Sequence, residues 1–417
     1  MLKTTFNKYK NNELLRSVAV YTTLSFVIKG ISFLITPFFT HYITPEQFGN
    51  INLFLTSIIF LNPIISISTN SILNSFYNDS KEIFGNKIST FILFSFFSTL
   101  ILILLIIIFK KHLWQINPSL FILISLPCIT FLSFLFELVI LISRNDSSKR
   151  RVFFATILKT IIEISFSIYF IIYLGMADKG RLLAYCLSIL LTSTWAILIL
   201  YKRYNLSFNF NFNYILIEYK FWISLIIGFF IILTFSVFDK FLVSSKFSKF
   251  EFGNYSFAFQ LGSILFSITN PIQLTLQNEL VKDLRNITGI NILKKLYTSF
   301  FAFVIMGIVM YLILWYIFVN FIHSSYINSL PFIKWTILLF VLFSIFNSYM
   351  ILLNYLKKSK IILLTGFSSI LLLLPLQFYI TDIYPPIAIV ILQINYFLFL
   401  IIILNKIISR IIKYNNN

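Results

Sequence analysis

Long apolar runs alternate with short polar breaks along almost the whole chain. A helix that crosses a bilayer needs ~20 mostly apolar residues, and in lipid its backbone groups must bond within the segment. The runs therefore predict spanning α-helices. In 417 residues we expect about twelve of them. Their ranges are 16–40, 50–76, 88–109, 118–142, 152–174, 182–201, 220–244, 254–280, 296–320, 327–355, 361–380 and 385–410.

The composition agrees with this pattern. Hydrophobic residues make up 59% of the chain, charged residues 11%, and the mean hydropathy is +0.91. A soluble protein has about 25% charged residues, so we predict an all-α integral membrane protein. The net charge of +19 would suggest nucleic acid as a partner of a soluble protein. Here Lys and Arg lie mainly in the breaks between apolar runs, so we interpret them as orientation signals and expect no nucleic-acid partner.

The basic residues also predict sidedness and domains. Most of the 33 Lys and Arg residues fall on the side that both termini share, so both termini are predicted to be cytoplasmic. The polar stretch "YKRYNLSFNFNFNYILIEYK" (201–220) separates two sets of spans. Its Phe and Asn alternation could be a lipid-surface strand or a partner site, but a plain connector is the simpler interpretation. We expect an N-terminal six-helix bundle (1–205), a cytoplasmic linker (206–219) and a C-terminal six-helix bundle (220–417).

Two short stretches suggest that these halves are repeats. "PEQFGN" (45–50) and "KFEFGN" (249–254) are 204 positions apart, and each falls in the predicted outer loop before the second span of its half. Asp79 and Asp283 each follow the motif glycine by 30 residues. Equal spacing in two halves that enter from the same side predicts a parallel repeat about an axis along the membrane normal. A third Phe-Gly-Asn at 84–86 has no counterpart, so each glycine could instead simply end a turn.

Three stretches carry a resemblance to a known family. They are "KGISFLITPFFTHYITPEQFGNINLF" (29–54), "LGMADKGRLLAYCLSILL" (174–191) with its Gly180-Arg181 pair, and "VFDKFLVSSKFSKFEFGNYSFAFQLGSIL" (237–265). Together with the twelve predicted spans they resemble the Wzx-type oligosaccharide flippases of the multidrug/oligosaccharidyl-lipid/polysaccharide exporter superfamily. The resemblance implies translocation of undecaprenyl-diphosphate-linked sugar units, of O-antigen or capsule type, across the bacterial inner membrane. It also implies a polysaccharide polymerase and a chain-length regulator as partners.

Charged residues inside the predicted spans are the candidate site. Each costs about 2.5 to 3.5 kcal/mol on insertion scales, so each needs a reason. A polyprenyl-diphosphate headgroup is anionic, and lysines in a wet cavity between the halves would bind and release it as point charges. The candidate substrate-binding residues are Lys29, Lys159, Lys240 and Lys334, and the candidates for ion coupling are Asp239, Glu163 and Glu137.

Each of these residues also has a structural interpretation. Lys240 and Lys334 could snorkel to the outer interface. Lys159 and Glu163 are four positions apart and could neutralise each other. Glu137 could pair near the cytoplasmic end with Arg144, and Asp239 could pair with Lys240. Lys29 is in the middle of its span and has no acid within one helical turn. A purely structural interpretation is therefore hardest to support for this lysine.

Two prolines are candidate hinges. Asn62-Pro63 and Asn270-Pro271 fall in the second span of each half, where we expect them to interrupt the helix. Interrupted helices at corresponding places in two repeats indicate a central site and hinges. Prolines are also common in membrane helices as packing kinks.

Transport without catalysis is the predicted function. We expect a flippase that moves the lipid-linked oligosaccharide to the periplasmic leaflet by alternating access, with membrane lipids as its surroundings. The main alternative is a cation-coupled multidrug or metabolite antiporter. A membrane polymerase or glycosyltransferase is disfavoured because every predicted outer loop is short, and the histidines and the two cysteines form no metal motif. We therefore expect no metal. No phosphate-binding Gly-Lys-Ser/Thr loop occurs, so we expect no ATP hydrolysis and no cofactor, and a proton or sodium gradient as the energy source if transport is driven.

Overall fold

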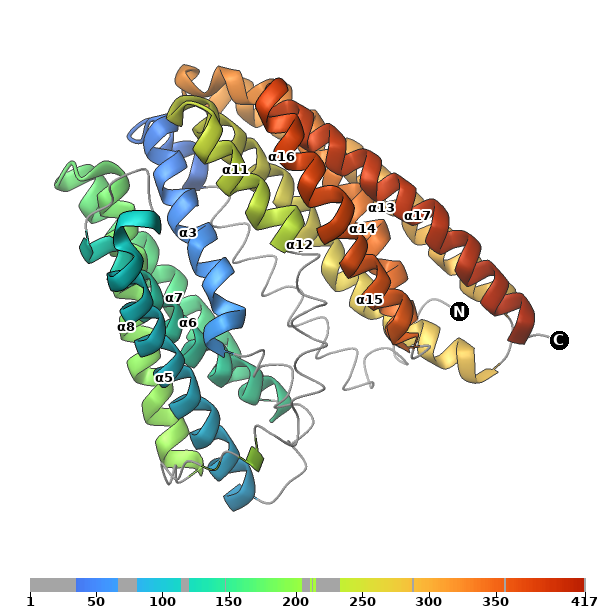
Figure 1. Cartoon of the computed structure of the whole chain (residues 1–417), viewed down its shortest axis with the longest axis horizontal. Helices are drawn as coiled ribbons and strands as arrows, with labels where there is room; N and C mark the ends of the chain where they lie inside the picture. The colour runs from blue at the N-terminus through green and yellow to red at the C-terminus, as the bar shows by residue number, and fades with distance from the viewer. Residues whose placement is uncertain are drawn as a thin grey trace, which may run out of the picture. The chain divides into compact units, whose positions relative to one another are not determined.

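The structure is a computed structural model that describes residues 35–66, 81–113, 120–146, 148–204, 211, 213–214, 233–286, 289–355 and 358–415. All regular secondary structure within these ranges is helical, which confirms the predicted all-α fold (Figure 1). The elements are α3 (Pro45–Ser66), α5 (Lys81–Leu113), α6 (Leu120–Asn145), α7 (Lys149–Ile168), η1 (Tyr169–Tyr173), α8 (Ala177–Tyr204), η2 (Thr234–Phe238), α11 (Asp239–Lys246), α12 (Lys249–Asn286), α13 (Gly289–Phe321), η3 (Ser324–Ser329), α14 (Leu330–Tyr355), α15 (Ser359–Ser368), η4 (Ser369–Leu373), α16 (Leu374–Ile383) and α17 (Ile387–Asn415).

Nine helical segments in the described ranges are long and apolar enough to cross a membrane. They coincide with predicted spans two to six and nine to twelve, and α12 covers the predicted eighth span. The first and seventh predicted spans fall mostly outside the described residues. The chain is therefore a multi-pass membrane protein whose span pattern follows from its apolar runs.

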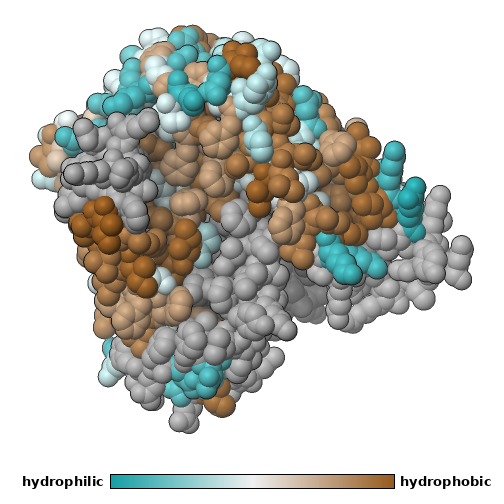
Figure 2. Space-filling view, in the orientation of Figure 1, coloured by the Kyte–Doolittle hydropathy of each residue, from teal (hydrophilic) through white to brown (hydrophobic). Residues whose placement is uncertain are grey.

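The outward surfaces of these helices suit lipid. On α5 an apolar stripe is exposed at helical spacing: Phe97 is 52% exposed, Ile101 56%, Leu104 58% and Ile108 69%. Figure 2 shows apolar side chains over much of the visible flanks of the helices. A stripe of this kind needs an apolar surrounding, since no other described element covers it.

The described residues form two compact units. The N-terminal unit lies within residues 51–233, and the C-terminal unit consists of residues from 1–50 together with 234–417. The division therefore falls inside α3, between Asn50 and Ile51. The predicted domain limits at 205 and 220 stay a prediction, because most of the linker is outside the described residues.

Each unit has its own core. In the N-terminal unit, α5, α6 and α8 bury a cluster that includes Phe91, Phe134 and Leu138. In the C-terminal unit α14 is the central helix, with 83% of its most apolar window buried, and it packs against α12, α13 and α17. Polar contacts join its neighbours to it, such as Gln273 Nε2 donating to the Ser344 carbonyl at 2.8 Å.

The two Phe-Gly-Asn stretches lie in the first turns of α3 and α12, so their predicted placement in loops is wrong. Thr44 and Ser248 cap the two helices. The Gln47 side chain accepts from the Thr44 amide at 2.9 Å, and the Glu251 carboxylate accepts from the Ser248 amide at 3.1 Å. These are capping boxes, which explains why Gln or Glu precedes each Phe-Gly-Asn. The third copy, at 84–86, also lies near the start of a helix, α5.

The glycines of the two stretches meet in the C-terminal unit. A Cβ atom on Gly253 would lie 1.9 Å from the Pro45 carbonyl oxygen, and one on Gly49 would lie 3.3 Å from the Gly253 Cα. The first turn of α3 thus packs directly on the first turn of α12, and a side chain at Gly253 would prevent it. The two copies of the motif therefore contact each other within the C-terminal unit, and the repeat of the two halves stays a prediction.

The helices α3 and α12 continue through Pro63 and Pro271. The expectation that these prolines interrupt their helices is therefore wrong. Each proline still lacks the amide hydrogen that would bond to the preceding turn. A hinge at either position stays a prediction.

Candidate functional site

The four candidate lysines have different surroundings. Lys29 lies outside the described residues. Lys334, near the start of α14, is exposed with its Nζ 5.3 Å from the centre of the Trp335 ring, as expected of a lysine that reaches an interface. Lys159 is half-buried and Lys240 is 9% exposed. Among the three candidate lysines that the structure describes, Lys159 and Lys240 therefore lie inside the helical bundles, and the role of Lys29 stays a prediction.

Lys240 lies at a π-helical turn of the C-terminal unit. The turn η2 ends at Phe238, and α11 begins at once with Asp239 and Lys240. The Lys240 Nζ donates to the Ser236 carbonyl at 2.9 Å and lies 4.3 Å from the centre of the Phe259 ring on α12. Its ammonium therefore turns inward, and the snorkelling interpretation of Lys240 is wrong. Single π-helical turns occur frequently at functional sites.

Asp239 is fully buried beside it. The Tyr255 hydroxyl of α12 donates to Asp239 Oδ2 at 2.6 Å, and the Gln393 side chain of α17 also approaches the carboxylate. Asp239 and Lys240 make no direct salt bridge among the described contacts, because neighbouring residues on a helix point in different directions. The two charges still lie within electrostatic range of each other. Sequence spacing could not reveal Tyr255 or Gln393, since both come from other helices.

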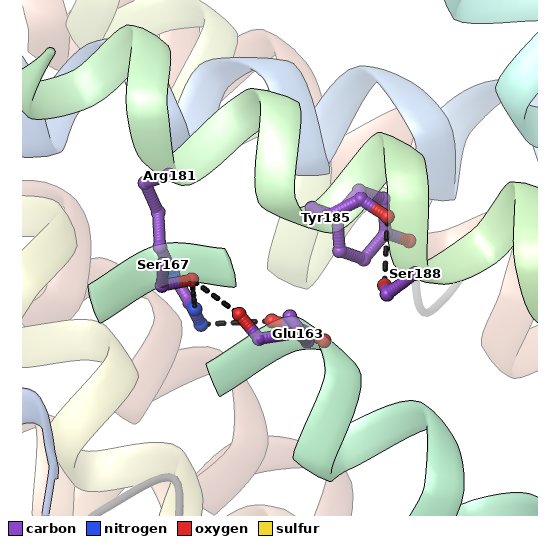
Figure 3. A network of polar contacts seen from close by, with 5 residues as sticks. All are labelled: Glu163, Ser167, Arg181, Tyr185 and Ser188. Carbon is purple, nitrogen blue, oxygen red and sulfur yellow. Dashed lines mark hydrogen bonds and ion pairs between the residues drawn. The ribbon is translucent and has the colours of Figure 1, made fainter. Parts of the chain in front are cut away.

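A second polar cluster lies in the N-terminal unit between α7 and α8. The Glu163 carboxylate of α7 pairs with the Arg181 guanidinium of α8 at 2.8 Å (Figure 3). Another Arg181 nitrogen donates to the Ser167 hydroxyl at 2.5 Å, and that hydroxyl donates to the Glu163 carbonyl at 2.6 Å. One turn before Glu163 on α7, the Lys159 Nζ lies 5.5 Å from the Tyr185 ring centre and 5.3 Å from that of Phe136. Sequence analysis placed Glu163 in the site but missed Arg181 as its partner.

Gly175 and Gly180 bring Arg181 into place. The connection from η1 to α8 turns through Gly175 at φ +63° and Ala177 at φ +44°, conformations that favour glycine. Gly180 lies so close to η1 that a Cβ on it would meet the Phe170 Cβ at 2.9 Å. The glycine lets the start of α8 approach α7, and its neighbour Arg181 then reaches Ser167 and Glu163.

Replacing Gly180 with alanine should therefore weaken the Glu163–Arg181 contact. The new methyl group would push the start of α8 away from Phe170, and a misfit of this kind costs about 1 to 3 kcal/mol. We expect a lower melting temperature for the purified variant in detergent. Gly175→Ala has open space around the new methyl, so its cost is backbone strain alone. A Gly180→Ala protein as stable as wild type would contradict the close approach.

Glu137 on α6 belongs to the same region. It is exposed, and Asn62 Nδ2 of α3 donates to it at 3.4 Å. Tyr185 lies within electrostatic range of both Glu137 and Glu163. The helices α6 and α7 thus bring Lys159, Glu163 and Glu137 around Tyr185 of α8. Within the described ranges no three His, Cys, Asp or Glu side chains come together as metal ligands, and the predicted lack of a metal stays a prediction.

No family model matches the chain, and no curated protein matches it. Solved structures do match across nearly the full length. One is the inward-facing conformation of a multidrug resistance MATE family transporter of the MOP superfamily, with 13% identity, a TM-score of 0.69, and coverage of 95% of this chain and 96% of that chain. Another is the outward-facing conformation of such a transporter, with 13% identity, a TM-score of 0.58 and the same coverage.

A third match is a MOP superfamily transporter from Pyrococcus furiosus, described as having a binding pocket of reverse polarity that suggests a different function. Its identity is 12%, its TM-score 0.57, and the match covers 94% of this chain and 95% of that chain. At such low identity these likenesses show the fold alone. The chain has the two-bundle helical fold of the MATE transporters, in agreement with the predicted architecture.

Proposed function

We propose that this protein is an alternating-access flippase for a polyprenyl-diphosphate-linked oligosaccharide. The observation that carries the proposal is the inward placement of cationic groups: Lys240 and Lys159 lie within membrane-spanning bundles with their ammonium groups against aromatic rings. A cation costs free energy in such a segment, and an anionic headgroup that passes through would offset that cost. The transporter fold supports a cycle between two conformations.

The positive charge of these lysines is the reason for proposing an anionic cargo. A diphosphate carries negative charge at neutral pH, and lysines attract it without the fixed geometry of a guanidinium, which suits a ligand that must be released. The matched Pyrococcus transporter, with its pocket of reverse polarity, supports the idea that this fold accommodates pockets of different charge. Under this proposal the protein resides in the bacterial inner membrane with cytoplasmic termini. It supplies units to a polysaccharide polymerase and its chain-length regulator.

A cation-coupled multidrug antiporter is the second candidate. The buried Asp239, hydrogen-bonded to Tyr255, favours it because a buried acid is a natural site for a proton, a sodium ion or a cationic substrate. Two of the matched structures are multidrug transporters by description. The two candidates differ in the sign of the cargo, and one experiment separates them.

That experiment reconstitutes the purified protein in vesicles with two cargoes. One cargo is a fluorescent lipid with a diphosphate-linked sugar, whose flipping is followed by quenching from outside, and the other is a cationic dye. Flipping of the lipid without accumulation of the dye is the expected result. Dye transport without lipid flipping would contradict the proposal and favour the antiporter.

Lys29→Ala provides a test in cells. Lys29 lies ~13 residues, or ~20 Å, along its predicted span, which is deep for snorkelling, so a hydrated anion-binding cavity would explain it. We expect the variant to insert normally but to deliver little polysaccharide to the cell surface, and Lys29→Arg to keep part of the activity because the charge remains.

The readout is surface polysaccharide on gels, normalised to the amount of protein in the membrane. Lys334→Ala is the matched control, because Lys334 is exposed near a helix end and should tolerate the change. Full activity of Lys29→Ala at normal abundance would remove Lys29 from the site.

A further inference from the structure

The Glu163–Arg181 pair lies on the inner face of α7. At roughly 100° per residue, Lys159, Glu163 and Ser167 project from the side of the helix opposite Phe154 and Ile161. Phe154 is 55% exposed and Ile161 56%, as suits a lipid-facing side, whereas the Arg181 and Glu163 side chains are 24% and 20% exposed. The charged face is thus directed away from the lipid-facing side yet keeps some access to solvent.

The corresponding helices of the second half provide an internal control. The helix α7 starts at Lys149 and α8 at Ala177, and α15 and α17 start 210 residues later, at Ser359 and Ile387. At that displacement Glu163 corresponds to Leu373 and Arg181 to Ile391. This second pair of spans is joined by a neutral contact, Ser368 Oγ to the Tyr396 hydroxyl at 2.7 Å. Packing two such helices therefore does not require an ion pair.

A half-buried ion pair is also a weak stabiliser. Removing two charges from water costs free energy that their attraction only partly offsets. A pair that packing does not need, and that adds little stability, calls for a functional explanation. The Arg181 fork offers one, because guanidinium binds phosphate oxygens through two parallel hydrogen bonds.

We infer that Arg181 is an anion-binding residue for the diphosphate headgroup, and that Glu163 occupies it until the headgroup arrives. This rests on the proposed function. A diphosphate oxygen replaces the Glu163 carboxylate at Arg181, and Ser167 holds the guanidinium in place through the exchange. The released carboxylate does not stay uncompensated, because Lys159 lies one turn away on the same face of α7. Arg181 thus recognises the cargo, although it was not among the site residues predicted from the sequence.

The test measures binding of geranyl diphosphate to the full-length protein in detergent, by calorimetry. We expect Arg181→Gln to weaken binding ~10-fold or more and Glu163→Gln to strengthen it severalfold, because the competing carboxylate is gone. The double variant Glu163→Gln/Arg181→Gln should bind as weakly as Arg181→Gln. Lys179→Gln is the matched control: this exposed lysine is also in the first turn of α8, and its loss should leave affinity unchanged.

The double variant distinguishes recognition from structure. If Arg181 only neutralises Glu163, removing both charges should restore wild-type affinity, and that result would overturn the inference. Should Arg181→Gln not fold, Arg181→Lys replaces it: severalfold weaker binding supports the role of the fork, and unchanged binding contradicts it. Wild-type protein that binds no geranyl diphosphate would contradict the proposed function itself, whereas wild-type binding with an indifferent Arg181→Gln contradicts the inference alone.

Discussion

Gly253→Ala should leave little folded protein in the membrane. The added Cβ would lie 1.9 Å from the carbonyl oxygen of Pro45 and 2.4 Å from its carbonyl carbon, far inside van der Waals contact. Both atoms belong to the backbone, so no side-chain rotation can relieve the clash. Overpacking in a close contact costs about 1 to 3 kcal/mol and occasionally more, and we expect the upper part of that range here.

Pro45 cannot easily move away because its surroundings are tied to the C-terminal unit. The Tyr326 hydroxyl donates to the Ile43 carbonyl at 2.7 Å, and the His323 amide donates to the Thr40 hydroxyl at 3.1 Å. The Phe48 ring packs edge-on against Phe257 at 5.1 Å between centroids. The methyl group at residue 253 must therefore break several contacts of residues 40–48 together.

Gly49→Ala is the matched comparison, since its Cβ would meet the Phe252 ring at 3.0 Å and the Gly253 Cα at 3.3 Å. A ring can shift, so we expect a smaller loss of stability. The measurement is the melting temperature and the monodisperse yield of each variant after extraction in detergent. Equal stability of Gly253→Ala and wild type would show that the two helix starts do not touch as described.

The span pattern was predictable from the sequence because lipid imposes one requirement on every segment. Apolar runs of sufficient length must become helices, whatever their partners are. The capping boxes were also readable, since Thr44 with Gln47 and Ser248 with Glu251 carry the spacing of that motif. We predicted loops there because the polar residues of the motif look like a break between spans.

The candidate site was less predictable because its contacts join separate helices. A charge within a span indicates that a partner must exist, but not where it is. Glu163 has Lys159 one turn away, yet its carboxylate reaches Arg181 at the start of the next helix. For Lys240 the sequence left two interpretations open, a substrate-binding residue or a lysine that snorkels to the interface, and could not show that the Nζ donates to the Ser236 carbonyl in the π-helical turn before it. The periodicity of apolar residues along the sequence does not predict a π-helical turn.

Asp239→Asn should make transport insensitive to ion gradients. Under the proposed function, transport that is not driven by nucleotide hydrolysis needs an ion gradient, and Asp239 is a fully buried acid of the C-terminal unit. Asparagine has nearly the same shape and still accepts the Tyr255 hydroxyl, so the variant should fold. It cannot, however, take up and release a proton or hold a sodium ion through a carboxylate charge.

The measurement is cargo transport in vesicles before and after a proton or sodium gradient is collapsed with an ionophore. Transport by the wild type should slow severalfold when the gradient is collapsed. Transport by Asp239→Asn should be slow both with the gradient and without it. Tyr255→Phe removes the hydrogen bond to Oδ2 but keeps the acid, so it should still respond, with a changed pH dependence.

Asp382→Asn and Glu163→Gln complete the design. Asp382 is 56% exposed and pairs with Lys246 at 2.7 Å on the surface of the same unit, so its loss should leave the gradient response intact. Glu163 is the other candidate for coupling, and a normal response of Glu163→Gln would assign the coupling to Asp239 alone. A normal response of Asp239→Asn would instead mean that this buried acid serves only to hold Tyr255 and α12 in place, and that the driving ion binds elsewhere.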